Sequence, residues 1–211
     1  MQLMKKMIVE FIGTFFLVFT VGMTALRTPG GVIAPLAIGS ALMIMVYAGG
    51  YISGGHYNPA VTLAVLLRGK KISLKNALGY WVSQIAAAFV AASMVLYMKG
   101  NGGMPPSFEP KGPVFLAEFL FTFALAWVVL NTATAEGTKG NSFYGLAIGF
   151  TVMTGAFAVG PVSGGAFNPA VVTGAALIGL ISVGYVWLYI LANLTGAAVA
   201  AVIFRMVAES K

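Results

Sequence analysis

Cysteine is absent from this chain of 211 residues, and histidine occurs only once, at position 56. Without cysteine there is no disulfide, no thiol nucleophile and no cysteine-ligated metal. A single histidine also argues against a histidine-rich metal site, so we expect neither a metal nor another cofactor. No nucleophile and base occur in a recognisable arrangement, and we therefore do not expect an enzyme.

Charged residues are equally scarce. They make up 8% of the chain, against roughly 25% in an average soluble domain, while 59% of residues are hydrophobic and the mean hydropathy is +0.94. Such a composition is typical of membrane proteins, and no segment between the apolar stretches is long enough to form a soluble domain. The net charge of +7 could indicate nucleic-acid binding. The basic residues are scattered without an aromatic-interleaved patch, so we do not expect nucleic acid as a partner.

Long apolar stretches predict an all-α protein embedded in a lipid bilayer. About 20 apolar residues in a helix cover the ~30 Å hydrocarbon core. Six stretches are long enough, with approximate limits Met7–Leu26, Val32–Tyr51, Ala77–Met98, Val114–Thr134, Phe143–Gly160 and Ile181–Val207.

The basic residues predict the orientation. Six crossings leave both termini on one side, and basic residues are enriched in cytoplasmic loops. Nine fall on the side of the termini and three on the other, which predicts a plasma-membrane protein with both termini in the cytoplasm. The nine are Lys5, Lys6, Arg68, Lys70, Lys71, Lys75, Lys139, Arg205 and Lys211, and the three are Arg27, Lys99 and Lys111.

An internal repeat organises the chain. When the sequence is shifted by 110 positions, Leu36–Val61 falls on Leu146–Val171, and 14 of the 26 paired residues are identical. Upstream, Glu10 recurs as Glu118 with a small slip in register. Three crossings per half require the halves to have opposite orientations, which is an inverted-topology repeat. We therefore expect one domain over residues 1–211, with halves at about 1–100 and 113–211.

Each half contains an Asn-Pro-Ala motif followed by a short apolar segment. Asparagine is a favoured N-cap and proline is favoured in the first helical turn, so each motif predicts the start of a helix. About ten apolar residues follow, enough for ~15 Å or half a bilayer. The Gly-rich backbone before each motif is tolerated at this depth only if it lines an aqueous cavity or is buried in protein, which predicts a central pore. The motifs are Asn58-Pro59-Ala60 and Asn168-Pro169-Ala170.

The doubled motif, the string ISGGHYNPAV and the paired ExxxT helices resemble the aquaporin (major intrinsic protein) family. The resemblance covers essentially the whole chain. It implies an aquaporin-like bundle of six transmembrane helices and two re-entrant half-helices, with one pore per subunit. It also implies a homotetramer and passive conduction without a cofactor.

The two motif asparagines are the leading candidates for pore residues. Each side-chain amide offers two donors, and each half-helix places about half a positive charge at its N-terminus. Donors and dipoles at the midplane would orient passing water and oppose cations, including hydronium. The alternative is that Asn58 and Asn168 serve only as N-caps, but two copies in register favour the pore role.

Three ionisable side chains near the motifs have competing interpretations. Glu10 and Glu118 lie within crossing helices, where carboxylates are costly and usually functional, so a proton relay is one hypothesis. The resemblance implies that they accept hydrogen bonds from the re-entrant loops, which agrees with the rule that buried charges are paired. A lone histidine is most often packed and hydrogen-bonded, and we interpret His56 as loop support.

The expected selectivity filter departs from the resemblance. Most members of the family follow the second Asn-Pro-Ala with arginine, whereas this chain has Val171. An ungapped alignment from the motifs gives Ile38, Ala156 and Gly165 as the remaining filter positions. The set is small, apolar and uncharged, which predicts a wider and more apolar gate. Some plant nodulin-type intrinsic proteins and bacterial relatives are similar in having enlarged filters.

These observations predict a passive channel for water and small neutral solutes that excludes ions and protons. Candidate solutes are glycerol, urea, ammonia and undissociated metalloid acids such as arsenite or silicic acid. A coupled secondary transporter is an alternative, but it would need an ionisable residue at the pore midplane. A structural, junction-type membrane protein with a vestigial pore is another, and the short loops and intact motifs argue against it.

Overall fold

A computed structural model of the chain describes residues 1–26, 31–69, 71–100 and 111–208. Three of the basic positions used to predict the orientation, Arg27, Lys70 and Lys211, lie outside the described residues. The described part is helical, as predicted. Its α-helices are α1 (Gln2–Ala25), α2 (Ile33–Ser53), α3 (Pro59–Arg68), α4 (Leu74–Lys99), α5 (Lys111–Val129), α6 (Tyr144–Ser163), α7 (Pro169–Leu177) and α8 (Val186–Ala208).

Six of the described helices are long and apolar enough to cross a membrane, which confirms the predicted crossings. Five boundaries differ from the prediction by three residues or more. The helices α1, α4 and α5 begin earlier than expected, at Gln2, Leu74 and Lys111. α6 continues through Pro161 to Ser163, because a transmembrane helix tolerates a proline when its surroundings satisfy the freed carbonyl. α8 begins at Val186, later than expected, after the 3₁₀ turn Val183–Tyr185, because Ser182 and Gly184 are weak helix formers.

The long helices form two trios. α1 packs against α2 and α4, and α5 packs against α6 and α8, while α2 and α6 join the two groups. The α2–α6 contact depends on glycine: a Cβ atom at Gly39 would lie 2.7 Å from the carbonyl oxygen of Gly149, and one at Gly149 would lie 2.5 Å from the oxygen of Gly39. These positions are related by the 110-residue repeat, and small residues allow the backbones to approach closely.

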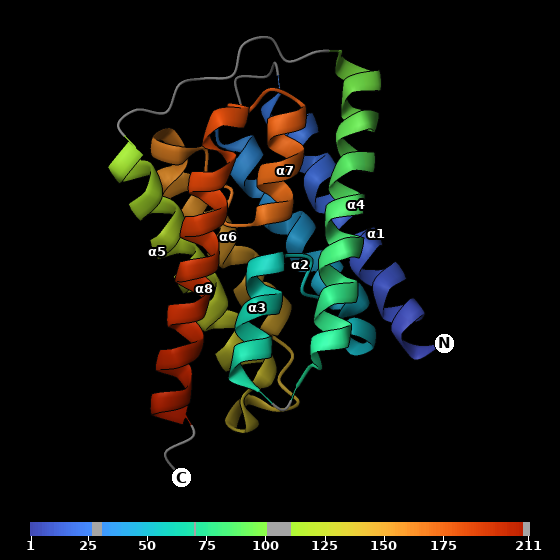
Figure 1. Cartoon of the computed structure of the whole chain (residues 1–211), viewed down its shortest axis with the longest axis vertical. Coiled ribbons are helices and arrows are strands. Elements are labelled where there is room, and N and C mark those ends of the chain that lie inside the picture. The colour runs from blue at the N-terminus through green and yellow to red at the C-terminus, as the bar shows by residue number, and fades with distance from the viewer. Residues whose placement is uncertain (27–30, 70, 101–110, 209–211) are drawn as a thin grey trace.

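The short helices α3 and α7 lie between α4 and α8, one above the other (Figure 1). α3 packs mainly against α8, whereas α7 packs mainly against α4. Each half-helix therefore packs against a long helix of the opposite half of the chain. With 10 and 9 residues, the two have the lengths expected of half-helices.

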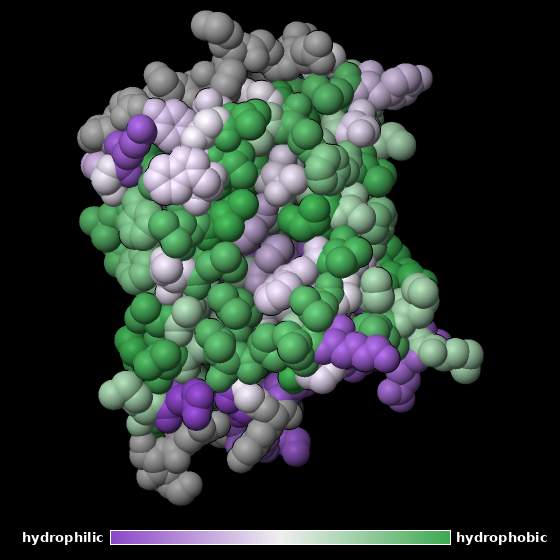
Figure 2. Space-filling view, viewed as in Figure 1, coloured by the Kyte–Doolittle hydropathy of each residue, from purple (hydrophilic) through white to green (hydrophobic). Residues whose placement is uncertain are grey.

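The outer surface of the bundle is apolar. Hydrophobic residues cover most of the middle of the face seen in Figure 2, and hydrophilic residues gather toward its ends. Large side chains such as Phe89, Phe150 and Trp187 are exposed in positions where a soluble protein would bury them. Lipid contact accounts for this exposure, and the protein is a multi-pass membrane protein.

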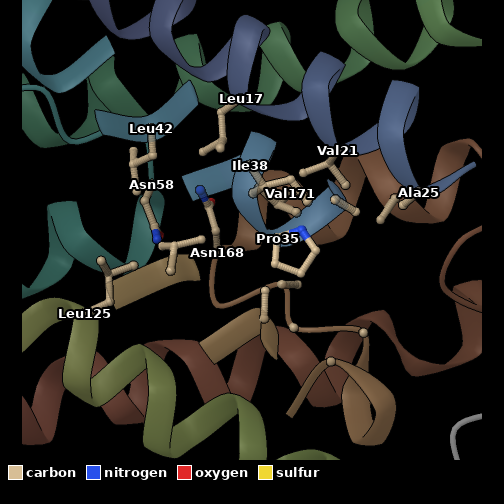
Figure 3. Close-up of a pocket in the computed structure, with 18 of the residues that line it drawn as sticks. Leu17, Val21, Ala25, Pro35, Ile38, Leu42, Asn58, Leu125, Asn168 and Val171 are labelled. Atoms are coloured by element: carbon tan, nitrogen blue, oxygen red, sulfur yellow. The ribbon is translucent and has the colours of Figure 1, made fainter. Parts of the chain in front are cut away.

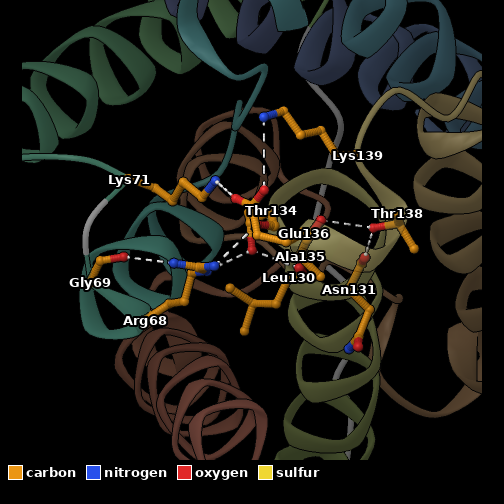
Figure 4. A network of polar contacts seen from close by, with 10 residues as sticks. All are labelled: Arg68, Gly69, Lys71, Leu130, Asn131, Thr134, Ala135, Glu136, Thr138 and Lys139. Carbon is orange, nitrogen blue, oxygen red and sulfur yellow. Dashed lines mark hydrogen bonds and ion pairs between the residues drawn. The ribbon is translucent and has the colours of Figure 1, made fainter. Parts of the chain in front are cut away.

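A π-helical turn, Leu130–Thr134, continues α5 and was not predicted from the sequence. Its last residue is bound by Arg68, which ends α3. Arg68 Nε donates to Thr134 Oγ1 at 2.9 Å, and Nη2 donates to the Thr134 carbonyl at 3.1 Å (Figure 4). The guanidinium also lies 5.4 Å from the ring centroid of Phe204. Arg68 is therefore a buried link between α3, α5 and α8 and not merely an exposed charge at the end of a helix.

Candidate functional site

The backbone between α2 and α3 turns inward at the centre of the bundle. Gly54 ends α2 in the left-handed conformation, with φ 97, and Asn58 caps α3. The loop directs its N–H groups at Glu10: the His56 N–H lies 2.9 Å from Oε1 and the Tyr57 N–H lies 2.7 Å from Oε2. The Ser53 hydroxyl donates to the same carboxylate at 2.7 Å. Glu10 thus satisfies loop donors that lack partners in the helix.

Glu118 has the same set of partners in the second half. Its carboxylate accepts hydrogen bonds from the N–H groups of Ala166 and Phe167 at 2.9 and 2.8 Å, and from the Ser163 hydroxyl at 2.8 Å. Asn193 adds an amide donor at 2.9 Å. Both glutamates are completely buried. Charge-assisted bonds to fixed N–H groups offset the cost of burying a carboxylate.

The two motif asparagines connect the halves reciprocally. Asn58 Nδ2 donates to the Phe167 carbonyl at 2.9 Å, and Asn168 Nδ2 donates to the Tyr57 carbonyl at 2.9 Å. The Oδ1 atoms accept backbone N–H groups of their own helices, at 2.8 Å from Ala60 and 2.9 Å from Ala170. Each amide nitrogen carries two hydrogens, so one N–H per asparagine remains available to a solute.

The residues before the asparagines have an unusual backbone conformation. Tyr57 and Phe167 both have φ 49, in the left-handed region that non-glycine residues rarely occupy. Such a conformation costs on the order of 1–3 kcal/mol and persists only where the surroundings enforce it. Here it directs the two carbonyls at the opposite asparagines. The strain is therefore associated with the link between the halves.

A cavity of ≈ 680 Å³ extends along the bundle past both asparagines, whose side chains line it (Figure 3). All four predicted filter positions, Ile38, Ala156, Gly165 and Val171, line this cavity. Within the described ranges, the only polar side chains along it are those of His56, Asn58 and Asn168. The walls are otherwise aliphatic, aromatic or glycine.

His56 lies beside the first motif and is 7% exposed. Its Nδ1 atom is 3.1 Å from Thr62 Oγ1, and its ring meets Tyr80 edge-on at 5.2 Å between centroids. Within the part of the chain that the structure describes, no three His, Cys, Asp or Glu side chains gather as a metal ion would require.

Several residues of the site were not identified from the sequence. Gln84 and Asn193 each donate to one of the buried glutamates, at 2.8 and 2.9 Å. Tyr80 and Tyr189 donate to the carbonyls of Ser53 and Ser163, the last residues of α2 and α6. Their spacing along the chain was the available signal. Gln84 and Asn193 lie 109 residues apart, as do Tyr80 and Tyr189, which is close to the period of the repeat.

Comparisons with known proteins agree with this architecture. A family model described as major intrinsic protein matches residues 1–204. A glycerol uptake facilitator protein-like 6 from Lactiplantibacillus plantarum is 38% identical, over 96% of this chain and 98% of its own. The rice protein aquaporin NIP1-4 (Oryza sativa subsp. japonica) is 36% identical, over 97% of this chain and 77% of its own. The X-ray structure of the aquaglyceroporin from Plasmodium falciparum has the same fold, with a TM-score of 0.79 at 22% identity over 97% of this chain and 96% of that one.

Proposed function

This chain belongs to the major intrinsic protein family, and from that premise we propose that it is a passive channel for water and small neutral solutes of about the size of glycerol. The cavity past the paired asparagines is the observation that carries the proposal. Its apolar walls and few polar groups suit a small uncharged solute and provide no site for an ion. The names of two relatives, a glycerol uptake facilitator-like protein and an aquaporin, support the same solute range.

The paired asparagines are proposed to exclude ions and protons. Each has one N–H left after bonding the opposite loop, and both cap half-helices whose N-termini meet at this point. A passing water would turn its oxygen toward these donors, which interrupts a proton-conducting chain. The helix N-termini add about half a positive charge each, which opposes cations.

The four predicted filter positions are proposed to form a wide, apolar outer gate. Val171 is 6% exposed and begins the first turn of α7 together with the Pro-Ala of the motif. No charged side chain lines the cavity within the described residues, so no guanidinium narrows it there. Glycerol, urea, ammonia and undissociated metalloid acids would pass such a gate by size.

Assembly and orientation follow the family resemblance. We propose a homotetramer in the plasma membrane, with both termini in the cytoplasm and one pore in each subunit. The exposed apolar side chains of the outer surface suit contact with lipid and with neighbouring copies. The two inverted halves, about 1–100 and 113–211, would form a single channel domain.

The test is a flux measurement on purified protein in liposomes. Water, glycerol and urea permeabilities are measured by light scattering after an osmotic step, with protein-free liposomes as the baseline. We expect wild-type protein to accelerate water and at least one of the two solutes. Ala156→Trp places an indole in the cavity and is expected to return both fluxes to the baseline. Wild-type flux equal to that of empty liposomes would contradict the proposal.

A further inference from the structure

The cavity past the asparagines, at ≈ 680 Å³, is larger than a second cavity of ≈ 250 Å³ that has Lys6 and Lys71 on its wall. The larger cavity has no charged side chain among the described residues. One half of it lies beyond Asn168, along α7, and Figure 3 shows part of this half to one side of the two asparagines. We call it the outer chamber and define it by six lining residues, Val21, Pro35, Ile38, Phe157, Val171 and Leu180.

The walls of the outer chamber are apolar on several sides. Four helices, α1, α2, α6 and α7, contribute to them. The three polar side chains that the described residues place on the larger cavity belong to the loops before α3 and α7 or cap those helices. None of them lies farther along α7 than Asn168. A water molecule in the chamber therefore lacks most of the about two to four polar partners that hold an ordered water.

Hydrogen-bonding groups gather at the base of the chamber. Asn58 and Asn168 each retain one N–H after they bond the opposite loop. Residues 164–166 also line the cavity, and their carbonyls accept no hydrogen bond from any described residue. A hydroxyl group at this point can accept from an asparagine and donate to a loop carbonyl. The base thus suits a group that is both a donor and an acceptor.

The base also has a sign of charge. The N-termini of α3 and α7 meet there, and each adds about half a positive charge. An uncharged oxygen is tolerated at such a place, whereas an ammonium group is repelled. The chamber therefore combines a base that selects against cations with walls that bind hydrocarbon.

The length of the chamber follows from α7, which runs beside it. This helix has 9 residues and is about 14 Å long. A small molecule with one polar end and an alkyl chain fits the space lengthwise, with its polar end at the asparagines. Burial of its chain displaces poorly held water, and each methylene should strengthen binding about three- to fourfold.

We propose that the outer chamber binds medium-chain primary alcohols such as 1-hexanol, and that a bound alcohol blocks the pore. The hydroxyl lies at the base, and the alkyl chain lies along α7 against Ile38 and Val171. The occupant is chosen by polarity, since the chamber offers hydrogen bonds at one end and only apolar side chains, among those described, along the rest. The proposal rests on the proposed channel function and adds a ligand class that occupies the pore without being conducted quickly.

The walls are tested with two isosteric substitutions, Val171→Thr and Val61→Thr. Val61 is the counterpart of Val171 in the repeat, and it lines the same cavity from α3, on the other side of the asparagines. Water permeability of liposomes is measured with increasing 1-hexanol, and each variant is compared with its own flux without alcohol. Protein-free liposomes show the effect of the alcohol on the bilayer.

We expect the half-inhibitory concentration of 1-hexanol to be about fivefold or more higher for Val171→Thr than for Val61→Thr, because the alkyl chain would bury the new hydroxyl. In the wild type this concentration should fall about three- to fourfold per methylene from 1-butanol to 1-hexanol. Equal sensitivity of the two variants would mean that the alcohol acts through the lipid, and it would overturn the inference.

The base is tested with hexylammonium, which has the same chain as 1-hexanol and a cationic end. It should inhibit wild-type water flux much less than 1-hexanol does at the same concentration. Equal inhibition by the two compounds, or no inhibition by 1-hexanol, would overturn the inference while leaving the channel function intact. A wild type without water or solute flux would instead contradict the proposed function, and this inference with it.

Discussion

At the scale of the residue, the buried glutamates hold the two loops in their non-helical shape. Glu118 accepts four hydrogen bonds, two at each oxygen. Glu118→Gln replaces one oxygen with an N–H₂ group that faces donors, which leaves buried groups without partners. We expect a loss of ~2 kcal/mol or more in stability, measured as a lower unfolding temperature in detergent. Glu136→Gln is the control, since Glu136 is 73% exposed and its ion pairs contribute little. Equal effects of the two substitutions would contradict this role.

The outer gate makes a second prediction at this scale. Val171→Arg should narrow the larger cavity and add a fork of donors that hydrogen-bonds water. We expect glycerol permeability to fall about tenfold or more and water permeability to fall much less, because bulk excludes the wider solute. Val171→Met is the control: it adds length without donors, so it separates the effect of bulk on permeability from the effect of hydrogen bonding. Unchanged selectivity in the arginine variant would refute a wide outer gate in the wild type.

The sequence predicts those residues that the repeat duplicates. Asn58 and Asn168 occur in identical strings, and their capping role follows from the Asn-Pro order. The amide partners of the glutamates were not predicted, because Gln84 and Asn193 differ in type and lie in helices with no motif. Nor could the sequence show that the His56 side chain lines the larger cavity, since this depends on packing against the opposite half.

At the scale of the element, Arg68 couples a half-helix to the π-helical turn. Arg68→Met keeps an unbranched apolar stem but removes the donors to Thr134. We expect faster amide hydrogen exchange across residues 130–134 and a lower unfolding temperature, because the carbonyls left open by the turn lose their partner. Arg68→Lys should recover only part of the protection, since one ammonium cannot copy the fork of a guanidinium. Exchange in this segment that stays at the wild-type rate would refute the coupling.

Element boundaries show where sequence patterns stop being informative. Half-helix lengths were predicted well, because an Asn-Pro start and a glycine after Arg68 mark the ends of α3 directly. The π-turn at Leu130–Thr134 was missed, since its sequence LNTAT contains no proline or glycine that would mark a change in the helix. What distinguishes the turn is the arginine that binds it from another element, and no local pattern contains that information.

At the scale of the whole molecule, the absence of cysteine allows a direct test of orientation. Single cysteines at Lys75 and Glu136 should react with a membrane-impermeant maleimide only from the cytoplasmic side of intact cells or oriented vesicles. A cysteine at Val32 or Ser182, near the other ends of the helices, should react only from outside. These expectations follow from the excess of basic residues on the side of the termini. The reverse labelling pattern would overturn the predicted orientation.

Ion exclusion is also a property of the whole pore. Purified wild-type protein in planar bilayers should carry no cation current above background, even though no arginine follows the second motif. The N-termini of both half-helices still meet at the centre and oppose cations. Large currents with potassium or sodium would contradict this expectation.

The crossed packing of the half-helices bears on how the protein is made. α3 emerges from the ribosome early, but the helix it mainly packs against, α8, is the last to be synthesised. Until then the first re-entrant segment lacks that partner, and Asn58 lacks the Phe167 carbonyl. During biosynthesis the first re-entrant segment must therefore remain without its main packing partner. The centre of the pore is assembled only after translation has nearly finished.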